Sequence, residues 1–280
     1  MTRQTFADVL IWLARHWRIT GRYGIEGPLL NWFRHHFQGN LYQLGRLQFA
    51  RGAFKSKIKV FRRRPDGLVL ALAMDGMEFR PDGQVNGAGG VFAAPAEIIT
   101  AGLRETEEAW TGLPIHPKGY AVLQPVVLSK RRWVPVLQPQ DQVLHMHIPE
   151  SGPMDHEACG RSIKEALQFF PAYFPDEPPL ACCCTSWILD NQFEDILPPQ
   201  ANMVRFQKEL YLVPARTGNM ESTLKRIFGA VPDDLAQAPR DTTLRRAVLE
   251  HLERGGHLRG GSGFLLPQDY RWGEQVYRSQ

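Results

Sequence analysis

The stretch between residues 143 and 213 constrains the fold most, because its polarity pattern changes period several times within a short distance. Residues 143–148 alternate in period two, which predicts a strand whose two faces carry different side chains. One face holds Leu144, Met146 and Ile148, and the other holds Val143, His145 and His147. Two imidazoles are therefore expected to point to the same side of one strand.

A helix is predicted directly after this strand. The Gly152-Pro153 pair ends the strand, and Asp155 is the expected N-cap of a helix with Glu157 in its first turn. A short apolar strand at 180–187, a short helix at 188–197 and an alternating strand at 204–213 follow. The order strand, helix, strand, helix, strand is typical of a sheet flanked by helices.

The rest of the chain also divides into predicted elements. Helices are expected at 6–17, 27–37, 96–111, 221–228 and 242–254, where apolar or capping residues occur at helical positions, with Asp241 as the cap of the last one. Strands are expected in 41–84, where Arg-Pro-Asp-Gly turns occur at 64–67 and 80–83, and in 120–136, with a hairpin end at 130–132. Residues 259–263 are predicted to form a loop.

Composition and length suit an ordinary globular protein of one or two domains. At 280 residues the chain can bury a core without disulfides. No apolar run is long enough for a membrane span, and the N-terminus does not have the pattern of a secretory signal, so the cytoplasm is the expected compartment.

The four cysteines are expected to be small buried residues. They are Cys159 and the contiguous Cys182, Cys183 and Cys184, and their spacing fits neither paired disulfides nor a zinc site, so no metal is expected. The alternative is a thiol nucleophile near His145 or His147.

Charge is distributed unevenly along the chain. Residues 1–64 hold 13 basic and 2 acidic residues, whereas residues 65–200 hold 8 basic and 18 acidic residues. The basic N-terminal quarter could bind an anionic partner, or it could be a solvated face opposite the acidic middle of the chain. Nucleic acid is not the expected partner, because the basic residues lack the aromatic interleaving typical of single-strand binding.

Several short sequence motifs along the chain resemble those of a known protein family. They include His147-Ile-Pro, Gly152-Pro-Met, Thr185-Ser-Trp-Ile-Leu-Asp190, Leu197-Pro-Pro and Asn202-Met-Val-Arg-Phe-Gln207, preceded by Gly39-Asn-Leu-Tyr-Gln-Leu-Gly-Arg-Leu-Gln-Phe49. In this order and spacing the motifs resemble those of the GNAT-like acyltransferase family that has a dedicated N-terminal domain. The resemblance covers most of the chain.

The resemblance implies an α+β fold with two parts. A smaller helix-and-strand N-terminal domain at 1–135 would precede a GNAT-like acyltransferase domain at 136–280, built on a mixed sheet flanked by helices. The implied activity is transfer of an acyl group, expected to be fatty acyl, from a CoA or acyl carrier protein thioester to a primary amine. The amine could be a lysine or ornithine side chain of a peptide.

The expected chemistry needs a base for the amine, donors for a developing oxyanion and an acid for the leaving thiolate. Since imidazole titrates near neutrality, His147 is the first candidate for the base and His145 the second. Ser186 is the candidate acid. Each histidine could instead be structural at a strand edge, and Ser186 could simply cap a helix.

The resemblance also implies binding residues. Backbone amides on the first strand would hold the pantetheine arm and polarise the thioester, and the following turn would bind phosphate; these candidates are Leu144, Met146, Ile148, Ser151 and Gly152. The candidates for substrate binding are Trp187, Asp190 and Asn202. Trp187 could instead be a residue of the apolar core, and Asp190 could instead mark the end of a helix.

The turn at 150–155 departs from the family pattern. Glu150 replaces a basic or amide residue, Pro153 removes an amide donor, and Asp155 competes with a phosphate for the helix N-terminus. The donor could therefore be acyl-CoA or an acyl-phosphopantetheine on a carrier protein, whose acidic surface the basic N-terminal region could bind. A noncatalytic module that holds an acyl chain or a peptide is the alternative function.

Overall fold

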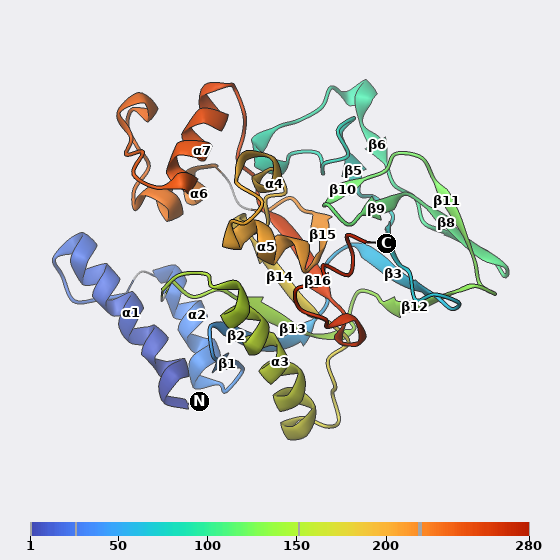
Figure 1. Cartoon of the computed structure of the whole chain (residues 1–280), viewed down its shortest axis with the longest axis horizontal. Helices are drawn as coiled ribbons and strands as arrows, with labels where there is room; N and C mark the ends of the chain where they lie inside the picture. The colour runs from blue at the N-terminus through green and yellow to red at the C-terminus, as the bar shows by residue number, and fades with distance from the viewer. Residues whose placement is uncertain (1, 26, 151, 218–219, 280) are drawn as a thin grey trace. The chain divides into compact units, whose positions relative to one another are not determined.

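The computed structural model describes residues 2–25, 27–150, 152–217 and 220–279 (Figure 1). The chain forms two compact units, and neither is one continuous stretch. The first unit comprises Met1–Ala53, Gln142–Cys183 and Leu266–Tyr270, and the second comprises Phe54–Asp141, Cys184–Leu265 and Arg271–Gln280. The single boundary after residue 135 stays a prediction.

The first unit combines helices with an antiparallel sheet. Its elements are α1 (Thr2–Thr20), α2 (Gly27–Phe37), β1 (Leu41–Leu44), β2 (Leu47–Ala53), β13 (Gln142–His147), α3 (His156–Tyr173) and the beginning of β14 (Cys182–Ser186). The strand order is β1-β2-β13-β14, with β2 antiparallel to both β1 and β13. Figure 1 shows α1 and α2 side by side at the N-terminal end, and α3 contacts β1 and β2.

These elements follow the sequence prediction closely. The predicted helices at 6–17 and 27–37 are confirmed as α1 and α2, and the predicted histidine strand is confirmed as β13. Asp155 caps α3 as expected, because its side chain accepts a hydrogen bond of 2.7 Å from the Ala158 amide.

The second unit contains most of the strands. A five-stranded sheet has the order β10-β9-β4-β3-β12, a three-stranded sheet the order β11-β8-β7, and β5 pairs with β6. Their bounds are β3 (Ile58–Arg63), β4 (Val69–Ala73), β5 (Glu78–Phe79), β6 (Ile99–Thr100), β7 (Arg104–Glu105), β8 (Ala109–Gly112), β9 (Pro114–His116), β10 (Tyr120–Ala121), β11 (Val126–Ser129) and β12 (Trp133–Leu137).

The second unit also contains a helical part. Its elements are the 3-10 helices η1 (Ala88–Gly90), η2 (Pro95–Glu97), η3 (Trp187–Leu189) and η4 (Leu235–Gln237), the helices α4 (Phe193–Ile196), α5 (Asn202–Lys208), α6 (Met220–Phe228) and α7 (Thr243–Glu253), and the strands β15 (Tyr211–Pro214) and β16 (Gly261–Leu265). A further 3-10 helix, η5 (Pro267–Asp269), belongs to the first unit. The predicted α+β class of fold is confirmed.

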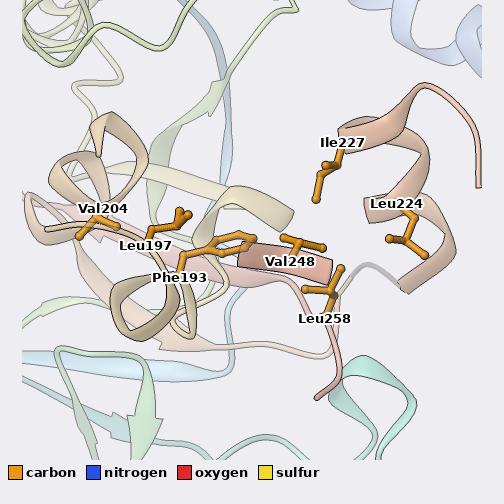
Figure 2. Packing of buried hydrophobic residues seen from close by; sticks show 7 residues of the cluster. All are labelled: Phe193, Leu197, Val204, Leu224, Ile227, Val248 and Leu258. Atoms are coloured by element: carbon orange, nitrogen blue, oxygen red, sulfur yellow. The ribbon is translucent and has the colours of Figure 1, made fainter. Parts of the chain in front are cut away.

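The helical part has its own apolar core (Figure 2). The buried members of this cluster come from α4, α5, α6, α7 and the segments beside them, and are Phe193, Leu197, Val204, Leu224, Ile227, Val248 and Leu258. Figure 2 shows Phe193 beside Val248 at the centre of the group. The predicted helices at 221–228 and 242–254 are confirmed because each contributes an apolar face to this core.

Three predicted elements are wrong. The expected helix at 96–111 is instead η2, β6, β7 and part of β8, where Trp110 is buried in the core beside Phe61. The expected strand at 204–213 begins as α5, and only β15 is extended. The expected loop at 259–263 includes the first half of β16, which is buried along its length and pairs antiparallel with β15.

Two smaller expectations are also corrected. Residues 130–132 form a turn but no hairpin, because β11 pairs with β8 while β12 pairs with β3. The N-cap of α7 is Thr242 rather than Asp241, since the Thr242 hydroxyl accepts a hydrogen bond from the Arg245 amide.

Candidate functional site

The two candidate histidines lie on β13, in the first unit. His145 and His147 face Ala50 and Gln48 of β2 in the antiparallel register. The intervening Met146 is buried and belongs to the opposite face of the strand. The alternation predicted from the sequence therefore places both imidazoles on one side of β13.

His145 fits closely against β2. Its Nε2 atom lies 3.1 Å from the carbonyl oxygen of Ala53, so this nitrogen donates a hydrogen bond in the matching tautomer. Its ring lies against Gly52, where a Cβ atom would be 3.0 Å from the imidazole. The missing side chain at Gly52 thus makes room for the ring.

His147 packs against a tryptophan from α2. Its ring centroid lies 4.6 Å from that of Trp32 in an edge-on arrangement. Trp32 in turn donates a hydrogen bond of 2.9 Å from its indole nitrogen to Asp8 of α1, and His36 Nε2 lies 3.1 Å from the same carboxylate oxygen. We call these residues, Asp8, Trp32, His36 and His147, the histidine–tryptophan cluster.

The electrostatics of this cluster keep His147 neutral. Burial, together with the neighbouring His145 and His35, lowers the pKa of His147 to about 4, while Asp8 opposes the shift. Burial raises the pKa of Asp8, but hydrogen bonds from His36 and Trp32 outweigh it and hold that pKa below its usual value. At neutral pH the cluster therefore combines an ionised carboxylate with an unprotonated His147.

Asp8, Trp32 and His36 were not predicted as site residues. Their helices show ordinary apolar spacing, and that spacing indicates only that α1 and α2 pack together. A usable signal is that Asp8 is one of two acidic residues among the first 64 and lies within an apolar helical pattern, because a carboxylate in such a position needs a donor.

The candidate amides on β13 differ in their surroundings. The Leu144 amide donates a hydrogen bond of 2.9 Å to the carbonyl of Ala181, so it is part of the backbone network and not a free donor. Met146 is buried, and Ile148 directly follows β13 and is half-buried. Their roles as pantetheine ligands remain predictions.

The turn before α3 is held by an arginine from the β1–β2 turn. Arg46 donates hydrogen bonds to the carbonyls of Pro153 and Gly152, at 2.8 and 3.0 Å, and Arg15 of α1 forms an ion pair with Glu150. The Gly152 amide donates to the Glu150 carbonyl. Ser151, the other candidate here, lies outside the described residues.

Ser186, Trp187, Asp190 and Asn202 belong to the second unit. The Ser186 hydroxyl accepts a hydrogen bond of 3.3 Å from the Ile188 amide and so caps η3, and Trp187 packs edge-on against Phe193 of the apolar core. Asn202 is exposed at the start of α5.

Asp190 is buried in a saturated hydrogen-bond network. Its carboxylate accepts hydrogen bonds from the Arg259 amide at 2.9 Å and from the backbone and side chain of Gln192. The guanidinium group of Arg259 also forms an ion pair with this carboxylate. Burial raises the pKa of Asp190 although these partners lower it. This network favours a structural role for Asp190 over contact with a substrate.

The cysteines are buried, as expected for small core residues. All four are free and buried. Burial raises the pKa of Cys159 to about 11 and that of Cys182 to about 12. Thiols held in the protonated form are poor nucleophiles, so the hypothesis of a thiol nucleophile loses support at these two positions.

Within residues 2–25, 27–150, 152–217 and 220–279, His, Cys, Asp and Glu side chains form no group of three that could hold a metal ion. In the same part of the chain, every helix is too short or too polar to cross a membrane.

Comparison with known proteins identifies relatives of the fold. The family model described as GNAT-like C-terminal domain matches residues 41–265. Among solved structures, a mutant acyltransferase in complex with octanoyl-CoA matches with a TM-score of 0.58 at 21% identity, covering 95% of this chain and 58% of that one. No curated protein matches the sequence significantly.

A second solved structure supports the same fold. An acyltransferase in complex with decanoyl-CoA and teicoplanin matches with a TM-score of 0.57 at 21% identity, again covering 95% of this chain and 58% of the other. The present chain thus spans less than two thirds of the length of these structures.

Proposed function

Because the chain belongs to the family with a GNAT-like C-terminal domain, we propose that it is an N-acyltransferase that moves a fatty acyl group from a pantetheine thioester to a primary amine. Support comes from the fold, which resembles acyltransferases solved with octanoyl-CoA and with decanoyl-CoA. One of those structures also holds teicoplanin, which is consistent with an acceptor larger than a small metabolite, such as a lysine or ornithine side chain of a peptide.

The reaction requires proton movements that histidine can perform. The amine nitrogen attacks the thioester carbonyl, the C–S bond breaks, and the departing thiolate takes up a proton. A base must first remove a proton from the amine, because an ammonium ion has no lone pair for attack. We assign this role to His147, with His145 as the second candidate.

The observation that carries the proposal is the placement of His147, which lies on the same side of β13 as His145 and packs edge-on against Trp32. Its pKa, lowered to about 4, leaves the ring unprotonated at pH 7, but a ring with so low a pKa is a weak base, so the imidazolium that forms needs a stabilising partner. Asp8 opposes the lowering of this pKa, and its carboxylate would favour the imidazolium that forms. The Ser186 hydroxyl is our candidate for protonating the thiolate.

The experiment is to measure acyl transfer by His147→Gln and His145→Gln proteins. Turnover of octanoyl-CoA and decanoyl-CoA with a lysine-containing peptide is followed by mass spectrometry of the peptide. Loss of the base should lower kcat roughly 10²-fold in His147→Gln, with little change in the KM for the acyl donor.

The matched control is His257→Gln, which changes an exposed histidine of the second unit and should retain full activity. If His147→Gln and the double variant with His145→Gln both keep wild-type kcat, neither histidine is the base. A wild-type protein that does not acylate the lysine-containing peptide with either donor would contradict the enzyme proposal itself.

The same assay distinguishes the two donor classes. Asp155 occupies the Ala158 amide at the start of α3, which leaves fewer donors for a pyrophosphate than an uncapped helix would offer. An acyl-loaded carrier protein should therefore be tested beside acyl-CoA. A much lower KM for the loaded carrier would identify it as the donor, and equal kinetics would identify CoA.

The altered turn also motivates the alternative function, a noncatalytic module that binds an acyl chain or a peptide. Native mass spectrometry with decanoyl-CoA separates the two. Retained ligand without any acylated amine favours the binding module, whereas acylated peptide excludes it.

A further inference from the structure

Helix α1 exposes apolar side chains on the side that faces away from its buried residues. Phe6, Leu10 and Trp17 follow one another at intervals of four and seven residues, which places them on one face of the helix. The buried residues Thr5 and Asp8 lie on the opposite side. This helix therefore has an apolar face that the described parts of the chain leave open.

The exposed face continues onto α2. The rings of Phe6 and Phe37 lie 5.7 Å apart, which joins the two helices at this surface. Leu10, Leu30 and Phe37 are 66%, 60% and 72% exposed, and Trp17 is about half-exposed. We call this set, Phe6, Leu10, Trp17, Leu30 and Phe37, the apolar ridge. Exposed apolar side chains grouped on one helix pair mark an interaction site in many proteins.

Basic side chains flank the apolar ridge. Arg3 and Arg18 on α1, Arg22 after it and Arg34 between Leu30 and Phe37 are all exposed. The first 40 residues contain five arginines and two acidic residues, and one of the two acids, Asp8, is buried against Trp32 and His36. The surface that surrounds the ridge is therefore complementary to an anionic partner.

We propose that the apolar ridge docks α1 and α2 onto the surface of an anionic lipid bilayer. Helices that lie in a membrane interface combine Trp, Phe and Leu on one face with arginine or lysine beside it. The ridge has this composition, and its side chains are exposed to solvent. The flanking arginines would contact lipid phosphates.

A lipid surface explains the observations better than a protein partner. Carrier proteins and other acidic proteins bind largely through charge, whereas here both helices expose large apolar side chains. A second copy of this chain would bring the same arginines face to face, which disfavours association. The proposal does not depend on the acyltransferase activity.

The test is sedimentation of the full chain with vesicles. Vesicles of phosphatidylglycerol mixed with phosphatidylcholine are compared with vesicles of phosphatidylcholine alone. The wild-type protein should sediment with the anionic vesicles only, and added salt should weaken its binding. Sedimentation with neither kind of vesicle would overturn the proposal.

Substitutions then locate the contact. The Leu10→Ser/Phe37→Ser protein should bind at least about tenfold more weakly, because it loses two inserting side chains. The Arg18→Gln/Arg22→Gln protein should bind about tenfold more weakly and respond less to salt. The matched control is Val127→Ser, which removes a side chain that is 68% exposed on β11 of the second unit and should bind like the wild type.

Each variant is checked for folding by circular dichroism and thermal unfolding. Unchanged vesicle binding by a folded Leu10→Ser/Phe37→Ser protein would refute the ridge as the contact. A dimer or a carrier-protein complex that forms at micromolar concentration, depends on Leu10 and Phe37 and excludes vesicle binding would equally refute the lipid assignment.

Discussion

Single residues acquire their chemistry from what packs around them, and His147 illustrates this. The sequence shows only a histidine on an alternating strand. The structure adds the edge of Trp32 at 4.6 Å and enough burial to lower the pKa of His147 to about 4. A histidine in this setting influences both the proposed reaction and the stability of the protein.

A pH dependence of stability follows from this pKa. In the unfolded chain the ring protonates near its ordinary value of 6.5, whereas in the folded protein it protonates near 4. Between these values the unfolded state binds more protons, so the stabilising contribution is complete above pH 6.5 and is lost as the pH falls towards 4. The loss should reach roughly 3 kcal/mol, measurable by urea denaturation across this range.

The His147→Gln protein should lose stability less steeply between pH 6.5 and pH 4, because this residue no longer titrates. The exposed His257 provides the control, since His257→Gln should keep the wild-type slope. Equal slopes in all three proteins would show that His147 protonates normally in the folded state.

At the level of elements, a serine joins the β1–β2 turn to α3. The Ser162 hydroxyl accepts hydrogen bonds from the Arg46 amide at 2.6 Å and the Leu47 amide at 3.2 Å, and donates to the Ala158 carbonyl at 3.0 Å. Gly45 has φ +62° and approaches this hydroxyl closely, so that a Cβ atom there would lie 2.8 Å from it. The turn and the helix are thus packed through one buried group.

Ser162→Ala should lower the free energy of unfolding by about 1–3 kcal/mol, because it leaves the amides of Arg46 and Leu47 without their acceptor. Denaturant unfolding measures this change. The control Ser279→Ala alters an exposed serine whose hydroxyl lies 3.4 and 3.5 Å from the carbonyls of Gln275 and Val276, and it should change stability by less than about 0.5 kcal/mol. A similar small effect at Ser162 would mean that water replaces the hydroxyl.

The wrong element predictions have specific physical causes. Residues 204–208 alternate in polarity, yet they form a helix in which the Gln207 side chain donates to the carbonyls of Ile188 and Asp190. Gly261 indicates a loop by composition, but it pairs with β15 as part of β16, and glycine is required there because a Cβ atom would be 2.0 Å from the Leu189 carbonyl oxygen. Both decisions depend on contacts with residues distant in sequence.

For the whole molecule, the cysteines report how completely the chain is packed. Cys159, Cys182, Cys183 and Cys184 are all buried, and none forms a disulfide. Colorimetric thiol titration should detect four thiols after unfolding and fewer than one per chain in the native protein over the same period. Thermal stability should be the same with and without a reducing agent.

Rapid modification of one thiol in the native protein would contradict this packing. It would also restore the hypothesis that a cysteine carries an acyl group, which loses its support if the native protein stays unmodified. The position of the reactive thiol follows from peptide mapping.

The sequence by itself determined the α+β class, the helices α1, α2 and α3, the histidine strand and the Asp155 cap, because local periodicity and capping carry that information. The short sequence motifs along the chain also indicated the family, and the match over residues 41–265 confirms it. Only the tertiary structure decided that Trp32 packs against His147 while it donates to Asp8, and that β16 is a strand. These features arise from contacts between residues far apart in the chain, where burial and close approach outweigh local propensity.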